Sequence, residues 1–333
     1  MKLSFVVPVY NTEDYLSECL DSLLHQDIPK SEYEIIIVND GSTDKSIEIA
    51  EDYASENSNI KILHQENGGL SAARNAGLEY AAGVYVWFID SDDYIKKNCL
   101  SSLMDKIAQH KDPDIVAISR IKYLSNNQSE KYIEKRANGL SGREFLYKRT
   151  YQAVVQCYLF HRDFLNEHKL VFLRGIYHED AEFTPRTLFY AQSMVFVEDI
   201  LYFHRYRQGS ITSSNYQKRF DDLITVAKSL ETFRNKYCNT YDDVKIFDKI
   251  ISYTLLYLFS LLYEYGDKKF AVKFIARLRK EKSLLKTLLT SEKSTFKIAY
   301  FVLNLNPALF WEIYSKFEKK RLDDKNSHRN THL

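Results

Sequence analysis

The sequence predicts an α/β fold: a mostly parallel sheet with helices on both faces, followed by a C-terminal helical subdomain. Three observations support this prediction. Four short apolar runs rich in β-branched residues lie in the first ninety residues, and segments with apolar residues at helical spacing separate them. Such alternation is typical of parallel strands joined by right-handed crossovers. From about residue 215 onward the apolar spacing is helical throughout.

The expected strands of the first half are short and apolar, and they cover residues 3–8, 34–38, 60–64 and 84–89. Helices are expected between them at 16–24, 47–54 and 71–83, the last ended by Gly83. Further along we expect strands at 114–124, 155–160 and 194–206, a helix at 180–191, and a polar loop or hairpin at 125–138. The expected C-terminal helices cover 217–236, 244–264, 267–281 and 294–318.

Composition and charge restrict the class of protein. The 333 residues carry a formal net charge of +1, so no overall positive field favours nucleic acid as a partner. The four cysteines are widely spaced and form no CxxC pair, which argues against a zinc site or a disulfide framework and fits a reducing cytoplasm. The N-terminal apolar run is broken by Pro8 and is too short for a signal peptide, and the apolar run at 253–263 is too short to span a bilayer.

The stretch DSDD, residues 90–93, places three carboxylates in four positions at the carboxyl end of an expected strand. Ionised carboxylates this close repel one another unless positive charge lies between them. Asp90, Asp92 and Asp93 can therefore hold a hard divalent cation such as Mg²⁺ or Mn²⁺ through oxygen ligands. The alternative is turn and helix-cap chemistry, in which Asp93 caps the next helix.

Two further polar segments follow neighbouring strands, and ligands of parallel sheets bind at such ends. In NDGSTD, residues 39–44, the glycine permits a tight turn, and Asp40 can accept a hydrogen bond from a ring N–H of a base. In ENGGLSAARN, residues 66–75, Gly68 permits close approach of the backbone, and Arg74 falls near the positive end of a helix, where anions bind. A well-formed turn and a surface arginine are the alternatives.

The segments FVVPVYNTEDYLSECLDSLLHQ, IIIVNDGSTD and NGGLSAARNAGLEYAAGVYVWFIDSDD follow one another in an order and at a spacing that resemble the family 2 glycosyltransferases of GT-A (Rossmann-like) fold. The resemblance is clear over residues 1–115 and continues more loosely through HEDAEF (178–183) and YRQGSIT (206–212). It implies a GT-A catalytic domain over 1–214, with a nucleotide-sugar-binding half at 1–115 and an acceptor half at 116–214, before a helical region at 215–333.

The family implies transfer of a sugar from a UDP-sugar, or another NDP-sugar, to a hydroxyl of a glycan or lipid-linked acceptor, with inversion and with Mn²⁺ or Mg²⁺. By resemblance, Asp40 and the loop after the first strand hold base and ribose, Arg74 lies near the nucleotide, and the DxD motif reaches the ribose and the metal-bound diphosphate. The residues expected to bind the nucleotide-sugar are Pro8, Val9, Tyr10, Asn11, Glu13, Asp40, Gly68, Arg74, Asp90, Ser91 and Asp92. The expected metal ligands are Asp92, Asp90 and Asp93.

The acceptor hydroxyl must lose its proton, and a positioned carboxylate can act as the general base. In the family the Asp of an ED pair takes this part, which corresponds to Asp180, with Glu179 as the second candidate. The alternative is that both acids lie at a helix N-terminus because the helix dipole favours them there. Some GT-A enzymes place a late His on the metal; here His204 lies three residues early, and Arg207 lies near the expected place.

Two other functions fit part of the pattern. A catalytically inactive nucleotide-sugar-binding or scaffold protein would not need both DSDD and HED, and a nucleotidyltransferase would need a glycine-rich basic loop that PVYNTEDYL lacks. The segment 296–321 mixes aromatic and aliphatic residues with Lys and Arg. We therefore expect either peripheral contact of the C-terminal helices with the inner face of a membrane or packing of the same face onto the catalytic domain.

Overall fold

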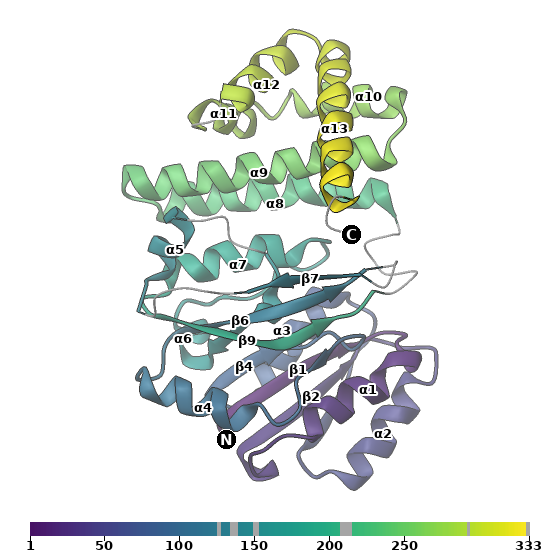
Figure 1. Cartoon of the computed structure of the whole chain (residues 1–333), viewed down its shortest axis with the longest axis vertical. Coiled ribbons are helices and arrows are strands. Elements are labelled where there is room, and N and C mark those ends of the chain that lie inside the picture. The colour runs from purple at the N-terminus through teal and green to yellow at the C-terminus, as the bar shows by residue number, and fades with distance from the viewer. Residues whose placement is uncertain (125–127, 134–138, 149–152, 207–214, 292–293, 331–333) are drawn as a thin grey trace. The chain divides into compact units, whose positions relative to one another are not determined.

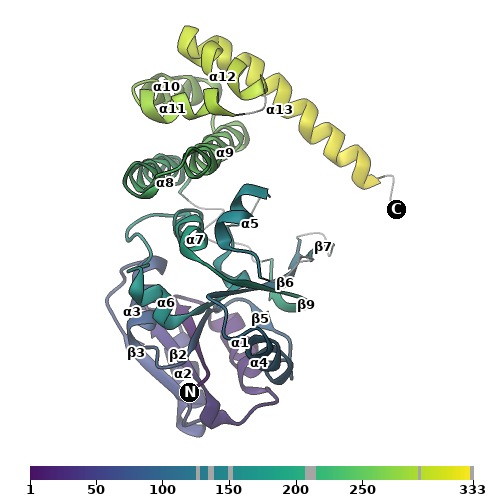
Figure 2. The ribbon, with the colours of Figure 1, turned by 90° about the vertical axis from the view of Figure 1, so that its left-hand side faces the viewer.

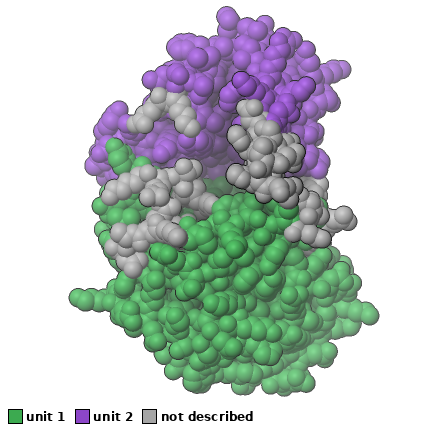
Figure 3. Space-filling model, in the orientation of Figure 1, with its two compact units in different colours: residues 1–214 green, residues 215–333 purple. Residues whose placement is uncertain are grey.

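The computed structural model describes residues 1–124, 128–133, 139–148, 153–206, 215–291 and 294–330. The chain forms two compact units, residues 1–214 and residues 215–333 (Figure 3). The first unit contains a sheet with helices on both faces, and the described part of the second contains helices only (Figure 1). Of the YRQGSIT segment only Tyr206 is described, so Arg207 lies outside the described residues.

The described residues of the first unit build a nine-stranded sheet in the order β3-β2-β1-β4-β8-β6-β9-β5, with β7 paired to β6. The strands are β1 (Leu3–Val9), β2 (Tyr33–Asn39), β3 (Ile60–His64), β4 (Tyr85–Phe88), β5 (Tyr94–Ile95), β6 (Ile115–Tyr123), β7 (Ser129–Tyr132), β8 (Tyr158–His161) and β9 (Met194–His204). β1 to β4 pair in parallel, which brings the carboxyl ends of four strands to one edge. β8 runs antiparallel between β4 and β6, and β6 and β9 are parallel.

Helices cover both faces of this sheet (Figures 1 and 2). They are α1 (Glu13–Leu24), α2 (Ser46–Glu56), α3 (Leu70–Tyr80), α4 (Leu100–Gln109), α5 (Gly142–Lys148), α6 (Arg162–Glu167) and α7 (Glu179–Tyr190), with two 3-10 turns, η1 (Lys30–Glu32) and η2 (Val155–Cys157). Buried side chains of α1, α2 and α4 join the core cluster on one face. On the other face α3 lies so close to β1 that a Cβ on Gly77 would be 2.3 Å from a methyl group of Val6. α7 packs there too, with the Phe183 ring 5.7 Å from that of Phe160 in β8.

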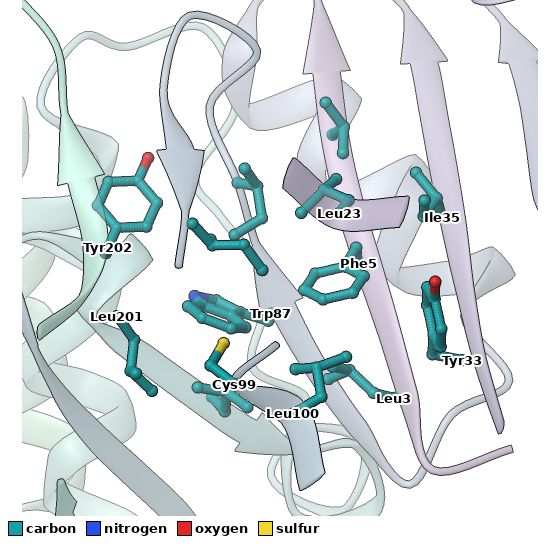
Figure 4. Packing of buried hydrophobic residues seen from close by; sticks show 14 of the residues in the cluster. Leu3, Phe5, Leu23, Tyr33, Ile35, Trp87, Cys99, Leu100, Leu201 and Tyr202 are labelled. Atoms are coloured by element: carbon teal, nitrogen blue, oxygen red, sulfur yellow. The ribbon is translucent and has the colours of Figure 1, made fainter. Parts of the chain in front are cut away.

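Three of the largest buried side chains of the first unit lie along the central parallel strands. The ring centroids of Phe5 and Trp87 are 5.6 Å apart, and Tyr33 meets Phe5 edge-on at 6.0 Å (Figure 4). All three side chains are fully buried. This core fixes the parallel strands, and with them the start of each loop at the carboxyl edge of the sheet.

The predicted fold class is confirmed, and the expected strands and helices of the first unit occur in the expected order. Of the polar loop or hairpin expected at 125–138, the described part contains β7, which pairs antiparallel with β6, and residues 125–127 and 134–138 lie outside the described residues. Two details are wrong. Residues 155–157 form η2, so β8 begins only at Tyr158. α3 ends at Tyr80 and not at Gly83; a Cβ on Gly83 would lie 2.5 Å from the backbone nitrogen of Ser4, so this glycine allows close approach to β1. The short helices α4, α5 and α6 were not predicted.

Over its described residues the second unit consists of α8 (Tyr216–Tyr237), α9 (Tyr241–Tyr265), α10 (Lys268–Leu278), α11 (Lys282–Thr290), α12 (Ser294–Leu305) and α13 (Pro307–Asn330). The single helix expected at 294–318 is wrong, because Pro307 has no backbone N–H and disfavours a helical conformation at Asn306. The Asn306 side chain instead accepts hydrogen bonds from the N–H groups of Ala308 (2.8 Å) and Leu309 (3.2 Å) and caps α13. The helix expected at 267–281 ends at Leu278, and α11 follows it unpredicted.

α9, with 25 residues, is the one helix among the described residues that is long and apolar enough to cross a membrane by length and composition; the mean hydropathy of its most apolar 18-residue window is 1.4. It contains the apolar run at 253–263. Its most apolar window is 67% buried inside the structure. Phe259 of α9 packs on Phe310 and Tyr314 of α13, with ring centroids 4.9 and 5.7 Å apart. These contacts are those of a core helix.

Candidate active site

The loops that follow the parallel strands are joined to one another at the carboxyl edge of the sheet. The Asn11 side chain accepts a hydrogen bond from the Thr43 N–H (2.8 Å), which connects the loops after β1 and β2. The Thr12 hydroxyl donates to the Ser91 hydroxyl (3.0 Å), which connects the first loop to the DSDD loop after β4. Three of the predicted ligand-binding segments therefore form one continuous surface.

The residues of the first loop differ in exposure. Pro8 and Val9 are buried at the end of β1, whereas Tyr10 is 48% exposed. Glu13 begins α1, and its carboxylate accepts from the Lys45 N–H (2.8 Å). Tyr10 and Glu13 are therefore the exposed members of this loop.

Asp40 organises the loop after β3. Its carboxylate accepts hydrogen bonds from the Gly68 N–H (2.8 Å), the Gly69 N–H (2.9 Å) and the Gln65 amide (2.6 Å). Gly69 has φ +80°, a left-handed conformation that a side chain would strain. Asp40 itself is only 3% exposed. Both carboxylate oxygens thus already have donors within the chain, and contact between Asp40 and a base stays a prediction.

Arg74 is buried and joins two segments that are far apart in the sequence. One guanidinium nitrogen lies 2.7 Å from Asp90 of the DSDD loop, and another lies 2.6 Å from Glu179 at the start of α7. Burial alone would lower the pKa of Arg74, but Asp90 and Glu179 outweigh it and hold the pKa above its ordinary value. The guanidinium is therefore a fixed positive charge inside the site. The sequence alone suggested a helix-terminal or surface residue, not this bridge.

The carboxylates of Asp90, Asp92 and Asp93 offer three oxygen ligands that lie within 4.8 Å of one another. Oxygen donors at this spacing suit Mg²⁺ or Mn²⁺, so the residues present fit such an ion. The second oxygen of Asp90 accepts from the Gln156 amide. Gln156 is a neighbour that the sequence analysis missed, because it lies 66 residues further along the chain.

Asp93 differs from the other two acids because it is buried, with 2% exposure. One of its oxygens accepts from the Tyr202 hydroxyl (2.5 Å) and the other from the Arg205 N–H (2.7 Å). Burial, and then the charges of Asp92 and Asp90, raise the pKa of Asp93 well above its ordinary value. These bonds attach the DSDD loop to β9, an attachment that no sequence signal indicated.

Glu179 and Asp180 begin α7, directly after His178, which adopts a left-handed conformation with φ +62°. Glu179 is bound to Arg74, while one Asp180 oxygen accepts from the Ala181 N–H (2.8 Å). Burial and the charge of Glu179 raise the pKa of Asp180 to about 8, although Arg74 opposes the shift. Asp180 is thus a stronger proton acceptor than an ordinary carboxylate, at a position within reach of the electrostatic influence of Asp90.

His204 lies at the end of β9, on the same strand as Tyr202. Burial lowers its pKa to about 4, so the imidazole is neutral at physiological pH and has a lone pair to offer.

Arg74 is thus a buried cation with the DSDD loop on one side and the Glu179–Asp180 pair on the other. It lies at the edge where ligands of parallel α/β sheets bind. Glycosyl transfer from a sugar nucleotide uses groups that stabilise the leaving diphosphate and a carboxylate that accepts the proton of the acceptor hydroxyl. The chain has the fold of a GT-A glycosyltransferase.

The comparisons with known proteins agree. The family described as Glycosyl transferase family 2 matches residues 4–169. The chain is 30% identical to the uncharacterized glycosyltransferase YibD of Escherichia coli (strain K12) over 319 residues, 91% of this chain and 90% of that protein. It is 34% identical to the uncharacterized glycosyltransferase EpsJ of Bacillus subtilis (strain 168) over 230 residues, 67% of this chain and 66% of EpsJ.

The crystal structure of S. aureus TarS 1–349 in complex with UDP-GlcNAc matches the fold with a TM-score of 0.76 at 23% identity, over 96% of this chain and 92% of that one. The chain belongs to glycosyl transferase family 2 and is a glycosyltransferase. The predicted family and the predicted class of enzyme are confirmed.

Proposed function

We propose that this chain transfers a sugar from a UDP-sugar, or another NDP-sugar, to a hydroxyl group of a glycan or lipid-linked acceptor, with inversion at the anomeric carbon. The observation that carries the proposal is the ion-pair network of Arg74, which holds Asp90 at one end and Glu179, beside Asp180, at the other. The Arg74 guanidinium thus contacts both the proposed donor side and the proposed acceptor side of the site. TarS was crystallised with UDP-GlcNAc, which supports a uridine nucleotide as the donor.

The proposed nucleotide site is the surface formed by the loops after β1, β2 and β4. Tyr10 offers an exposed ring to the base, and Asn11 and Ser91 lie at the two junctions between these loops. Asp40 acts through the Gly68–Gly69 backbone that it holds, as well as through its own oxygens. The remaining proposed contacts are made by Pro8, Val9, Glu13, Arg74, Asp90 and Asp92.

The proposed metal ligands are Asp92 and Asp90, with Asp93 in the same oxygen cluster. When bound, Mn²⁺ or Mg²⁺ stabilises the negative charge that develops on the leaving diphosphate. Asp93 contributes mainly by holding the loop, because it is 2% exposed and is bound to Tyr202 and Arg205, whereas the Asp90 side chain is 24% exposed. Because Asp92 directly precedes Asp93 in the chain, the bonds that hold Asp93 also position Asp92.

Asp180 is the proposed general base, and Glu179 is the second candidate. An oxygen of Glu179 is held by Arg74, so Asp180 is the more available of the two, and its raised pKa of about 8 suits proton abstraction. Attack of the acceptor oxygen on the face opposite the departing UDP inverts the anomeric configuration. A single displacement of this kind needs no covalent sugar intermediate.

We place the enzyme in the cytoplasm, peripheral on the inner face of a membrane, where a lipid-linked acceptor is accessible. The alternative function is a catalytically inactive nucleotide-sugar-binding or scaffold protein. Retention of Asp92 and Asp180 in one chain argues against it, since binding alone does not need a base. A nucleotidyltransferase fits less well because the first loop, PVYNTEDYL, has neither Gly nor Lys.

The test is a panel of UDP- and other NDP-sugars, each scored for thermal stabilisation with Mn²⁺ and for release of the free nucleotide. A donor that binds the native state raises the melting temperature, and we expect a UDP-sugar to do so and to release UDP. Binding without release, under all acceptors tried, would support the scaffold alternative. No stabilisation by any NDP-sugar would overturn the proposal.

A further inference from the structure

The last two helices carry an exposed apolar surface that the catalytic site does not use. We call it the α12–α13 stripe; its members are Ile298 (57% exposed), Phe301 (64%), Leu305 (74%), Leu309 (40%), Ile313 (48%) and Phe317 (56%). They recur every three or four residues and so occupy one face of each helix. The two helices follow one another with only Asn306 between them (Figure 2).

Packing within the unit does not account for the stripe, because it uses other residues of the same helices. In α13 the rings of Phe310 and Tyr314 pack on Phe259 of α9. In α12 the ring of Phe296 meets Tyr253 edge-on, with centroids 5.6 Å apart. Each helix thus has one apolar face turned inward and a second one exposed. Exposed apolar faces of this kind mark an interaction site.

Charge identifies the kind of partner. Residues 215–333 contain 23 Lys and Arg against 14 Asp and Glu, a formal net charge of +9, whereas residues 1–214 carry −8. Lys316 and Lys320 follow Ile313 at helical spacing and lie on the stripe's own face of α13. Among the described residues, neither forms an ion pair with a carboxylate, unlike Arg321, which pairs with Glu318. The stripe is therefore apolar with two lysines at its α13 end.

An anionic bilayer fits both properties, since apolar side chains enter the headgroup boundary and lysines meet the anionic lipids. A second copy bound through its own stripe fits less well, because it would set a unit of charge +9 against another of the same sign. A nucleic acid would use the cations but not the apolar side chains.

We propose that the α12–α13 stripe binds the surface of an anionic phospholipid bilayer, with its apolar side chains at the acyl boundary and Lys316 and Lys320 among the headgroups. The proposal extends the membrane location in the proposed function by naming the surface and the lipid class. It does not rest on the reaction, because binding is measured without turnover.

The test is cosedimentation of the full chain with vesicles of phosphatidylcholine alone and with vesicles that contain about one-third phosphatidylglycerol. The wild type is expected to bind the anionic vesicles and to be released as the salt concentration rises. The triple variant Phe301→Ser/Leu305→Ser/Ile313→Ser should lower the partition coefficient at least about tenfold. The matched control is Tyr241→Ser, which removes an 80% exposed aromatic ring from the same unit outside the stripe and should bind as the wild type does.

The charge variant Lys316→Glu/Lys320→Glu separates the two contributions. It should abolish the preference for anionic vesicles and leave UDP binding and the circular dichroism melting curve unchanged, which shows that the variant is folded. Wild type that stays in the supernatant with anionic vesicles, or a triple variant that still sediments fully, overturns the proposal. So does a wild-type dimer that the triple variant dissociates, because the stripe would then bind a second copy. Vesicle binding without any NDP-sugar turnover would contradict the proposed function alone.

Discussion

Replacing Arg74 by Met removes the buried cation that joins Asp90 to Glu179 and keeps a side chain of similar length. The guanidinium lies 2.7 Å from Asp90 and 2.6 Å from Glu179, and the Arg74 side chain is 1% exposed. Breaking a buried ion pair costs about 3–5 kcal/mol, because the remaining charge is left uncompensated. Without Arg74, Asp90 (24% exposed) can be hydrated again, and only Glu179 (10% exposed) is left largely without water. We therefore expect a loss at the lower end of this range, about 3 kcal/mol.

For a unit of 214 residues, a loss of this size corresponds to a fall in Tm of about 6–12 °C. The assay is thermal unfolding followed by circular dichroism. The control is Lys2→Met, which removes an exposed ion pair with Glu32 (2.8 Å, side chains 53% and 34% exposed) and should cost less than about 1 kcal/mol. If Arg74→Met melts within about 2 °C of the wild type, or no lower than Lys2→Met, the network does not hold the site together.

Three further predictions concern the site. Asp92→Ala removes a hard-cation ligand, so calorimetry should show Mn²⁺ binding weakened at least about tenfold with the Tm nearly unchanged; equal Mn²⁺ affinity would remove Asp92 from the ligand set. Because burial and Glu179 raise the pKa of Asp180 to about 8, and a base acts only when ionised, the transfer rate should rise with pH up to about 8 and then level off. A flat rate profile below about pH 8 would assign the base elsewhere. Tyr202→Phe deletes the hydroxyl bound to Asp93. It should lower the free energy of unfolding by about 1–3 kcal/mol and weaken Mn²⁺ binding. An unchanged Mn²⁺ affinity would show that this hydrogen bond does not position the DSDD loop.

The sequence was sufficient to predict the parallel half of the sheet, because strands and loops there are specified by local patterns. DSDD and NDGSTD each follow an apolar run directly, so their place at the carboxyl edge follows from the chain order. The contacts that hold these loops could not be predicted in the same way. The partner of Arg74 in α7 is 105 residues distant, and the partner of Asp93 in β9 is 109 residues distant. No local pattern encodes such pairs.

In the C-terminal helices, by contrast, the boundary between α12 and α13 has a local cause in the sequence. Helical spacing continues through 294–318 without interruption, and the pattern alone therefore predicted one helix there. Proline chemistry at Pro307, which is equally local, divides it into α12 and α13. The two apolar faces of α13 could not be separated into a packed and an exposed one from spacing alone, because both recur at helical intervals.

The most direct test of Asp180 as the general base is the transfer rate of Asp180→Asn, measured at saturating donor with an acceptor. The substitution keeps the shape of the side chain and removes its basic oxygen, so kcat should fall by about 10²–10⁴. UDP affinity should hardly change, because Asp180 is assigned to the acceptor. Glu182→Gln is the matched control: it alters a buried acid on the same helix, paired with Arg186, and should keep the rate. A rate for Asp180→Asn equal to that of the wild type would contradict the account.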